Sequence, residues 1–302
     1  MTGSRRLALR GGLILAMLCA LPLPVQYGWR YWFEHRSQPQ LEYRRLFNGI
    51  DYTRIVRASP APMVAHIVRI DLQAEGIGFL VTPGDTAGGG EVRARTTSEF
   101  LDAYGVQLAI NGSFFTPFHS NGPTDYYPHT GDTADIDGLA ISRGQAYSAP
   151  DPRNATMYLT ADNRVSLGAP GDTPFNALSG TRLLVENGRV TCETDAVRHP
   201  RTAVALDSAA RTLLLVVVDG RQPNYSEGAT LRELAELLAG NGAWTVLNLD
   251  GGGSSVLVIE DADGEPCQLS TPLTFRTWVG RERPVANHFG VFALPLTTKG
   301  AE

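Results

Sequence analysis

Two aspartates, each followed by a glycine, have the residue types and setting needed for acid–base chemistry. Asp219-Gly220 and Asp250-Gly251 each follow an apolar run, 212–218 and 243–249, of the kind that forms a buried strand. Residues 230–239 read as an amphipathic helix between the two runs. The two strands are therefore expected to be parallel neighbours, with both carboxylates at one sheet edge. Paired carboxylates with different pKa values carry out hydrolysis near neutral pH; the alternative interpretation is two turn-forming Asp-Gly pairs.

The second Asp-Gly pair opens a glycine-rich stretch. Three consecutive glycines can take positive φ values and present successive N–H groups as an anion-binding nest, and two hydroxyls add donors. A phosphate or a developing oxyanion would fit such a nest. The spacing matches neither a Walker A loop nor a dinucleotide fingerprint. The residues predicted to bind here are Asn248, Gly251, Gly252, Gly253, Ser254 and Ser255.

Arginines at predicted strand ends supply the positive charge that an anion would need. Lys299 is the only lysine, so any anion site must use the planar fork of arginine. A single arginine is usually a solvated surface residue, but several beside a glycine-rich loop would form a clamp. Asn111, directly after the predicted strand 106–110, could bind a sugar hydroxyl or phosphate oxygen, or simply form a turn. The further binding candidates are Arg201, Arg221, Arg283 and Asn287.

Other chemistries find less support in the sequence. There is no G-x-S-x-G elbow and no H-E-x-x-H motif, and the six histidines lack metal-ligand spacing. No metal or other cofactor is therefore predicted, with a calcium ion at the aspartate-rich residues 125–137 as a weaker alternative. Residues 116–137 show little periodicity and are expected to form a long loop without secondary structure of its own, which would be either functional or disordered.

The element pattern predicts an α+β (mixed α/β) fold, a sheet-rich single domain with few helices. Short strands are expected throughout 63–294, and residues 97–104 read as a helix capped by Thr97 or Ser98. The chain has 302 residues, 43% of them hydrophobic, and a net charge of −5. That acidic balance argues against a nucleic-acid partner.

The N-terminus resembles a targeting segment. Arg5, Arg6 and Arg10 precede the apolar run 13–25, which is typical of a secretory signal. That run is shorter than the roughly 20 residues of a membrane span, but no clear cleavage site follows, and 27–33 is an aromatic cluster typical of membrane interfaces.

We therefore predict a signal peptide or membrane anchor at 1–33, with a buried N-terminal helix as the alternative. A linker is predicted at 34–60 and the domain at 61–297. The domain is expected to be exported, periplasmic or extracellular, and attached to the membrane where the segment is uncleaved. Cys192 and Cys267 would then form one disulfide or stay as two thiols.

The order of motifs resembles the phosphodiester glycosidase family over roughly residues 105–294. The motifs are Asn111-Gly-Ser-Phe-Phe, Arg201-Thr-Ala-Val, Val218-Asp-Gly-Arg, Glu227-Gly-Ala-Thr-Leu with Glu233, Asn248-Leu-Asp-Gly-Gly-Gly-Ser-Ser and Arg283-Pro-Val-Ala-Asn. The resemblance implies hydrolysis of a sugar-1-phosphodiester, with Asp219, Asp250, Arg201, Arg283 and Asn111 in the site. Ser113 and the segment 228–230 depart from the family pattern.

The sequence thus predicts an extracytoplasmic hydrolase of glycosyl phosphodiesters or related cell-envelope glycans. Asp219, Asp250 and Glu227, which opens one of the matching motifs, are the catalytic candidates, without assignment of acid, base or nucleophile. One alternative is a non-catalytic envelope glycan-binding module, which would tolerate loss of the carboxylates. Another is a conventional glycosidase without phosphate recognition.

Overall fold

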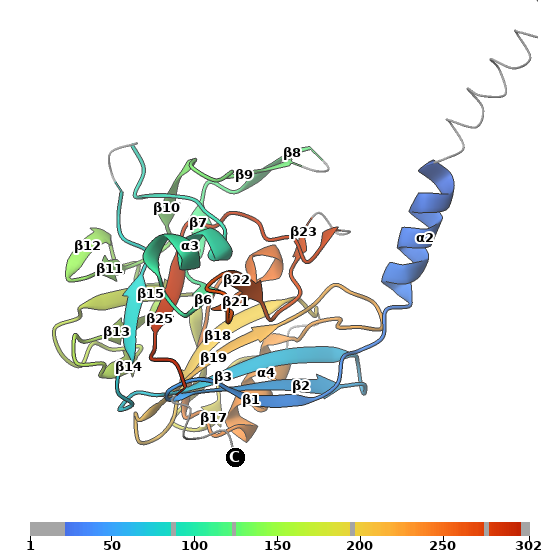
Figure 1. The fold of residues 1–302 in the computed structure, drawn as a ribbon. Coiled ribbons are helices and arrows are strands. Elements are labelled where there is room, and N and C mark those ends of the chain that lie inside the picture. The colour runs from blue at the N-terminus through green and yellow to red at the C-terminus, as the bar shows by residue number, and fades with distance from the viewer. Residues whose placement is uncertain (1–21, 86–88, 123–124, 194–196, 275–277, 297–302) are drawn as a thin grey trace, which may run out of the picture.

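The fold is built mainly from antiparallel β-sheets, as the computed structural model of residues 22–85, 89–122, 125–193, 197–274 and 278–296 shows (Figure 1). The prediction of a sheet-rich fold with few helices is confirmed. Eight strands form the largest sheet. In spatial order they are β1 Glu42–Phe47, β2 Ile50–Arg57, β3 Met63–Asp71, β19 Thr212–Val218, β18 Arg201–Leu206, β20 Thr245–Asn248, β16 Arg182–Glu186 and β17 Arg189–Val190.

Two five-stranded sheets and three smaller ones complete the β-structure. The first five-stranded sheet has the order β22 Pro266–Gln268, β21 Leu257–Glu260, β6 Leu108–Asn111, β25 His288–Phe292 and β4 Gly78–Val81. The second has the order β12 Gln145–Ser148, β11 Ala140–Ser142, β15 Asn176–Gly180, β13 Ala155–Leu159 and β14 Val165–Leu167. The small sheets are β5 Val92–Arg93 with β10 Thr133–Ile136 and β7 Phe115–Thr116; β8 His119–Gly122 with β9 Asp125–Tyr127; and β23 Leu273–Thr274 with β24 Trp278–Val279.

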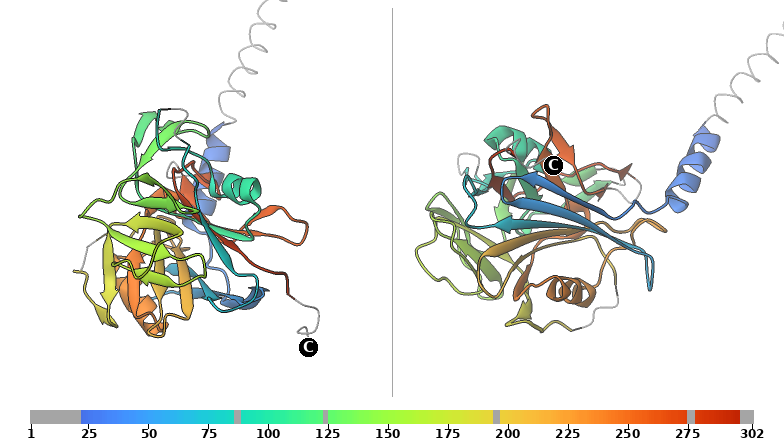
Figure 2. Two further views of the ribbon diagram at one scale, coloured as in Figure 1. Left: turned by 90° about the vertical axis from the view of Figure 1, so that its left-hand side faces the viewer. Right: turned by 60° about the horizontal axis from the view of Figure 1, so that its bottom comes forward.

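The helices begin where their capping residues allow. Helix α4, Leu231–Gly240, has Thr230 as N-cap in a capping box with Glu233. Helix α3, Thr97–Tyr104, is capped by Thr96 instead of the predicted Thr97 or Ser98, because Glu99 completes the box with Thr96. A short 3-10 helix, η2, covers Gly252–Ser254. Figure 2 shows α4 across one face of the eight-stranded sheet, with the other sheets on the opposite side.

The core lies on both faces of the eight-stranded sheet. Along β19, Leu213, Leu215 and Val217 pack between the sheets. The alternate residues Leu214 and Val216 pack under α4. A strand buried on both faces needs apolar residues at every position, which accounts for the continuous run in the sequence.

Two predictions about irregular segments are wrong. The predicted linker 34–60 contains β1 and β2, which pair with each other and with β3 in the main sheet. Only Ile50 and Tyr52 of β2 are buried and its other residues are half-buried, so the strand shows little hydrophobic alternation in the sequence. The predicted loop 116–137 contains a hairpin, β8–β9, and the strand β10, which pairs with β5 and β7. Because little of the hairpin is buried, its strands are polar and lack the hydrophobic alternation that predicts a strand.

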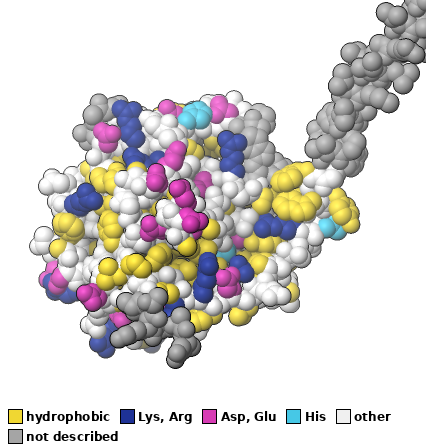
Figure 3. All heavy atoms as spheres, viewed as in Figure 1, with side chains coloured by type: hydrophobic (Ala, Val, Ile, Leu, Met, Phe, Trp, Pro, Cys, Tyr) yellow, Lys and Arg dark blue, Asp and Glu magenta, His cyan; other side chains and the backbone are white. Residues whose placement is uncertain are grey.

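The described part of the N-terminal segment is helix α2, Pro22–Glu34. Figure 3 shows hydrophobic side chains projecting from it, and Trp29, Tyr31 and Trp32 are all exposed. None of the helices in the described residues is long and apolar enough to span a bilayer. The remainder of the predicted signal or anchor, residues 1–21, lies outside the described residues. Cys192 and Cys267 are not joined by a disulfide.

Candidate active site

Four strand ends meet at one edge of the sheets and place the predicted residues. Strands β19 and β20 run in the same direction, but β18 lies between them and is antiparallel to both. The two strands are therefore parallel, as expected, but the prediction that they are neighbours is wrong. The strand–helix–strand pattern predicted correctly that β19 and β20 have the same direction. It could not predict the strand between them, because β18 comes from earlier in the chain. Because β18 begins at this edge, Arg201 lies beside the ends that carry Asp219 and Asp250.

Asp219 is a buried structural anchor. Its Oδ2 lies 3.1 Å from Nε2 of His66 and accepts a hydrogen bond from the Tyr225 hydroxyl at 3.2 Å. Its Oδ1 accepts from the Thr271 N–H at 2.7 Å. The side chain is 2% exposed, and the other ring nitrogen of His66 contacts the hydroxyl of the buried Tyr52. With both carboxylate oxygens in these contacts, Asp219 fixes the turn that carries Arg221.

Asp250 is the carboxyl that faces an open cavity. Its backbone carbonyl accepts a 2.6 Å hydrogen bond from the Asn111 side chain. The oxygen of Asn111 in turn accepts from the Thr202 hydroxyl at 2.7 Å. Asn111, predicted to bind substrate, therefore uses its amide to hold Asp250 in place. Burial raises the pKa of the Asp250 carboxyl, against the opposing effects of Arg283, the Ser254 hydroxyl and the Gly251 N–H.

Arg283 lies between an aromatic ring and the glycine-rich turn. Its guanidinium carbon lies 4.4 Å from the ring centroid of Phe118. Its Nε and Nη2 donate to the Ser254 hydroxyl oxygen at 3.1 and 2.6 Å. Burial lowers the pKa of Arg283, and the negative charge of Asp250 opposes that shift. Ser254 thus links the cation to the carboxyl.

Two further arginines, Arg201 and Arg221, line the same cavity as Asp250. Arg221 has a left-handed backbone conformation with φ of 60°, uncommon for a residue other than glycine. Its Nη2 donates to Nδ1 of His199 at 3.2 Å. The Nε of Arg201 donates to the Ala229 carbonyl at 2.9 Å, which holds its guanidinium beside the turn.

Gly252 and Gly253 make room for two arginine side chains. The N–H groups of Gly252, Ser254 and Ser255 donate to backbone carbonyls, so the predicted anion-binding nest is wrong for these three donors. Instead, a Cβ on Gly252 would lie 3.1 Å from Nη2 of Arg221. A Cβ on Gly253 would lie 3.2 Å from Nη1 of Arg283. The positive charge of the site therefore comes from guanidinium groups packed onto this turn.

Replacing Gly253 by alanine tests this packing. Gly253 is the suitable position because its φ is not positive, so alanine strains only the contact with Arg283. We expect kcat/KM to fall by about ten- to 100-fold, since small displacements of a charged group that positions substrate have large effects on rate. The melting temperature should change little. Gly240→Ala is the control, because a Cβ there meets nothing within 4 Å; equal activity of the two variants would refute the role of Gly253.

The cavity around Asp250 has a volume of about 340 Å³ and joins arginines with aromatic side chains. Asp250 carries the only carboxyl among the described residues that line it. Five of the lining residues were not among the predicted site residues, although Phe114 and Leu249 lie within motifs singled out in the sequence and His199 lies two residues before another. The lining residues are Phe114, Phe118, Tyr126, His199, Arg201, Arg221, Asn248, Leu249, Asp250, Gly251, Gly252, Gly253 and Arg283.

The remaining predicted site residues do not line this cavity. Glu227 is exposed beside a neighbouring depression that it shares with Arg221, and it meets Arg221 through a backbone hydrogen bond. Asn287 is fully buried, and its amide donates to the Tyr147 hydroxyl at 3.3 Å. Ser255 is 2% exposed. For calcium, no cluster of three or more acidic, histidine or cysteine side chains able to hold a metal ion occurs in the described parts of the chain.

Fold and site together define a class: a β-rich protein whose arginine-lined cavity holds one buried carboxyl. The family model described as phosphodiester glycosidase matches residues 104–292, more than half of the chain. The chain therefore belongs to the phosphodiester glycosidase family, as the motif resemblance predicted.

Curated relatives and solved structures agree with this assignment. The N-acetylglucosamine-1-phosphodiester alpha-N-acetylglucosaminidase of Bos taurus is 28% identical over 207 residues, which cover 60% of this chain and 36% of that protein. The Mus musculus enzyme of the same name is 27% identical over 207 residues, with 60% and 37% covered. The matched region thus spans only about a third of the length of these relatives.

The fold is shared with solved structures of low sequence identity. The catalytic domain of the zebrafish N-acetylglucosamine-1-phosphodiester alpha-N-acetylglucosaminidase, auto-inhibited by its pro-peptide, superposes with a TM-score of 0.56 at 21% identity, over 87% of this chain and 86% of that one. A putative exported protein from Burkholderia pseudomallei K96243 gives 0.55 at 16% identity, over 80% and 76%.

Proposed function

We propose that this protein hydrolyses glycosyl phosphodiesters, in which the anomeric carbon of a sugar is joined to a phosphate that carries a second alcohol. One observation carries the proposal: the only carboxyl in the described lining of the cavity, Asp250, lies among three arginines, Arg201, Arg221 and Arg283. A neutral glycoside would give these cations no counter-charge. The names of the bovine and mouse relatives suggest N-acetylglucosamine as the sugar.

The charges suit the reaction because the phosphate gains negative charge as the glycosidic bond breaks. A diester carries one negative charge, whereas the departing monoester carries about −1.5 to −2 at neutral pH. Interactions that strengthen in this way lower the barrier instead of merely improving binding. Since a phosphate monoester departs readily once its charge is stabilised, the arginines take over much of the role of a general acid.

Asp250 then acts on the sugar side in its charged form. A carboxylate there either attacks the anomeric carbon or takes a proton from an attacking water molecule. In the first case the released sugar retains its anomeric configuration, and in the second it inverts. The aromatic rings of Phe114 and Tyr126 provide the apolar surface on which the sugar ring can stack.

Arg283→Lys tests the phosphate recognition. Lysine keeps the charge but loses the planar fork and the stacking on Phe118, so we expect kcat/KM on an N-acetylglucosamine-1-phosphodiester to fall about 100- to 1,000-fold. Activity on a neutral aryl N-acetylglucosaminide should not fall in parallel. If the wild-type protein binds the diester without turnover, the result would instead support a non-catalytic glycan-binding module. If the wild type and Arg283→Lys are equally active and act on neutral glycosides alone, the result would support a conventional glycosidase.

The pH profile should report the burial of Asp250. Because burial raises its pKa, the active carboxylate is lost as pH falls through a value above the roughly 3.9 of an ordinary aspartate. We expect kcat/KM to fall on the acid side with an apparent pKa above that value. The Ser254 hydroxyl lowers the pKa of Asp250, so Ser254→Ala should move this acid limb to higher pH. An acid limb at the same pH in both proteins would contradict the assignment.

We also propose that the domain works outside the cytoplasm, on envelope glycans or related diesters. The support is the basic and then apolar N-terminal sequence, together with the similarity to an exported protein. Fractionation of cells that produce the full chain, followed by N-terminal sequencing of the mature protein, tests both the location and cleavage of the leader.

A further inference from the structure

Two segments that are distant in sequence meet beside the candidate active site. Residues 34–38, at the end of helix α2, form the junction segment, which leads towards strand β1 (Figure 1). Residues 219–226, which follow strand β19 and carry Arg221, form the arginine turn. The side-chain amide of Gln38 donates to the Tyr225 carbonyl at 3.1 Å, so the two segments are joined by a hydrogen bond.

Arg36 makes the central contact between the junction segment and the arginine turn. Its guanidinium carbon lies 3.6 Å from the centroid of the Tyr225 ring, which is a cation–π contact. Its Nη1 donates to Oε1 of Gln222 at 2.5 Å. Gln222 directly follows Arg221, and its amide donates in turn to the Thr271 carbonyl at 2.8 Å. Arg36 therefore holds two side chains of the turn, one of them next to an arginine of the site.

The Tyr225 side chain connects Arg36 to the buried Asp219. Its hydroxyl donates to Oδ2 of Asp219 at 3.2 Å and lies 3.1 Å from Oγ1 of Thr271. Burial raises the pKa of this hydroxyl to about 12, so it keeps its proton and remains a donor. The junction segment and the contacts of Asp219 therefore stabilise the same turn together.

The arginine turn needs this support because its backbone is strained. Arg221 and Asn224 both have a φ of 60°, in the left-handed region that residues other than glycine rarely adopt. Such conformations persist only where the surrounding structure holds them. The side-chain amide of Asn224 donates to the Glu34 carbonyl, which ties one strained residue to the junction segment. The other strained residue packs its guanidinium onto Gly252 in the candidate site.

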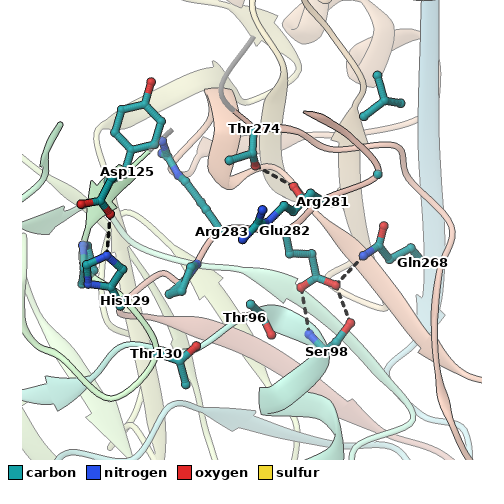
Figure 4. A pocket seen from close by; sticks show the side chains of 15 residues that line it. Thr96, Ser98, Asp125, His129, Thr130, Gln268, Thr274, Arg281, Glu282 and Arg283 are labelled. Atoms are coloured by element: carbon teal, nitrogen blue, oxygen red, sulfur yellow. Dashed lines mark hydrogen bonds and ion pairs between the residues drawn. The ribbon is translucent and has the colours of Figure 1, made fainter. Parts of the chain in front are cut away.

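The neighbouring Arg283 is held by other parts of the chain. Figure 4 shows it beside Glu282, which accepts hydrogen bonds from the Ser98 N–H at 3.0 Å and from the Gln268 amide at 2.7 Å. None of these contacts involves the junction segment. A change in that segment should therefore displace Arg221 and leave Arg283 in place.

We propose that the junction segment is a positioning element of the active site, in which Arg36 acts through the arginine turn to hold Arg221 against the substrate phosphate. The role of the phosphate rests on the proposed function, whereas the positioning of the turn does not. A mature, active protein should then begin before Glu34. N-terminal sequencing measures this, and an active mature form that begins after Gln38 would overturn the proposal.

Arg36→Ala tests the positioning role on a glycosyl phosphodiester. We expect kcat to fall and KM to rise, with kcat/KM lower by about ten- to 100-fold, because a small displacement of a group that positions substrate has a large effect on rate. Methylguanidine, which can occupy the space of the lost side chain, should restore part of the activity.

The matched control is Arg30→Ala. Arg30 lies in the same helix as the start of the junction segment, but its side chain pairs with Glu34 and is 76% exposed. This variant should keep the wild-type kcat and KM and should not respond to methylguanidine. A lower kcat of Arg36→Ala at unchanged KM, in proportion to its folded fraction, would show a merely structural role and overturn the proposal.

A double-mutant cycle shows whether Arg36 acts through Arg221. Arg221→Ala alone and the double variant with Arg36→Ala should have nearly the same kcat/KM, because the second change then has no guanidinium left to displace. If the two losses multiply instead, Arg36 acts independently of Arg221 and the proposal is wrong.

Hydrogen exchange separates this proposal from the proposed function. The N–H groups of Arg221, Gln222 and Ser226 all donate to backbone carbonyls of the turn or the residue that follows it. Mass spectrometry of the turn peptide should show faster exchange in Arg36→Ala than in the wild type or Arg30→Ala. That result would support the positioning role even where no diester is hydrolysed. Hydrolysis by the wild type, with unchanged exchange and activity in Arg36→Ala, would uphold the function and reject the positioning role.

Discussion

Asp250→Asn is expected to remove at least about 1,000-fold of kcat/KM on a glycosyl phosphodiester while the protein stays folded, the effect typical of a catalytic carboxyl. Asparagine keeps the size and leaves the backbone bond from Asn111 intact, but it can neither attack the anomeric carbon nor take a proton. The measurement is single-turnover kinetics, because it excludes a rate limit at product release.

Stability provides the control for this variant. Burial raises the pKa of Asp250, so the folded state holds the neutral form more strongly than the unfolded state does. The stabilising contribution of this group is therefore complete below the ordinary aspartate pKa and is lost as pH rises through the raised one. At neutral pH the charge costs stability, and Asp250→Asn should melt no lower than the wild type. Retained turnover in a folded Asp250→Asn protein would refute the catalytic assignment.

Asp219→Ala is expected to act on stability first, with a loss of about 3–5 kcal/mol in the free energy of unfolding, as for removal of one partner of a buried polar network. The change leaves His66, the Tyr225 hydroxyl and the Thr271 N–H without their acceptor. Each such buried group costs about 1–3 kcal/mol when it is left without a partner. Urea unfolding monitored by circular dichroism measures the loss.

A comparison of the two aspartates makes this prediction specific. Asp219→Asn keeps an oxygen for the Thr271 N–H and should be less destabilising than Asp219→Ala. Its residual activity should follow the folded fraction, since Asp219 positions Arg221 without lining the cavity. If Asp219→Asn stayed as stable as the wild type but lost activity as completely as Asp250→Asn, Asp219 would belong to the catalytic groups after all.

The sequence singled out many of the residues that lie together at the candidate site, because they follow strand ends, where apolar runs stop and polar residues begin. The runs before Asp219 and Asp250 predicted two buried strands with a common direction. They could not show that β18 lies between those strands, because adjacency in a sheet depends on the whole topology. The different roles of the two aspartates could not be predicted for the same reason, because His66 and Thr271, which contact Asp219, are distant from it in sequence.

The glycine-rich turn and the hairpin β8–β9 show what a local pattern leaves open. Three glycines predict an unusual backbone, but either an anion or a packed guanidinium could be the reason for it. Only the approach of Arg221 and Arg283 to Gly252 and Gly253 decides between them. The hairpin pairs few residues and buries little surface, so the sequence around Phe118 and Tyr126 shows no hydrophobic periodicity that would predict their position.

The three arginines that line the cavity with the Asp250 carboxyl also bear on the rate of product release. A site that favours growing negative charge binds the doubly charged monoester more tightly than the singly charged diester. If the protein hydrolyses such diesters as proposed, we expect product release to limit repeated turnover, so that the first turnover is faster than the later ones. On the same proposal, inorganic phosphate should compete with the diester for these guanidinium groups and lower the rate of hydrolysis.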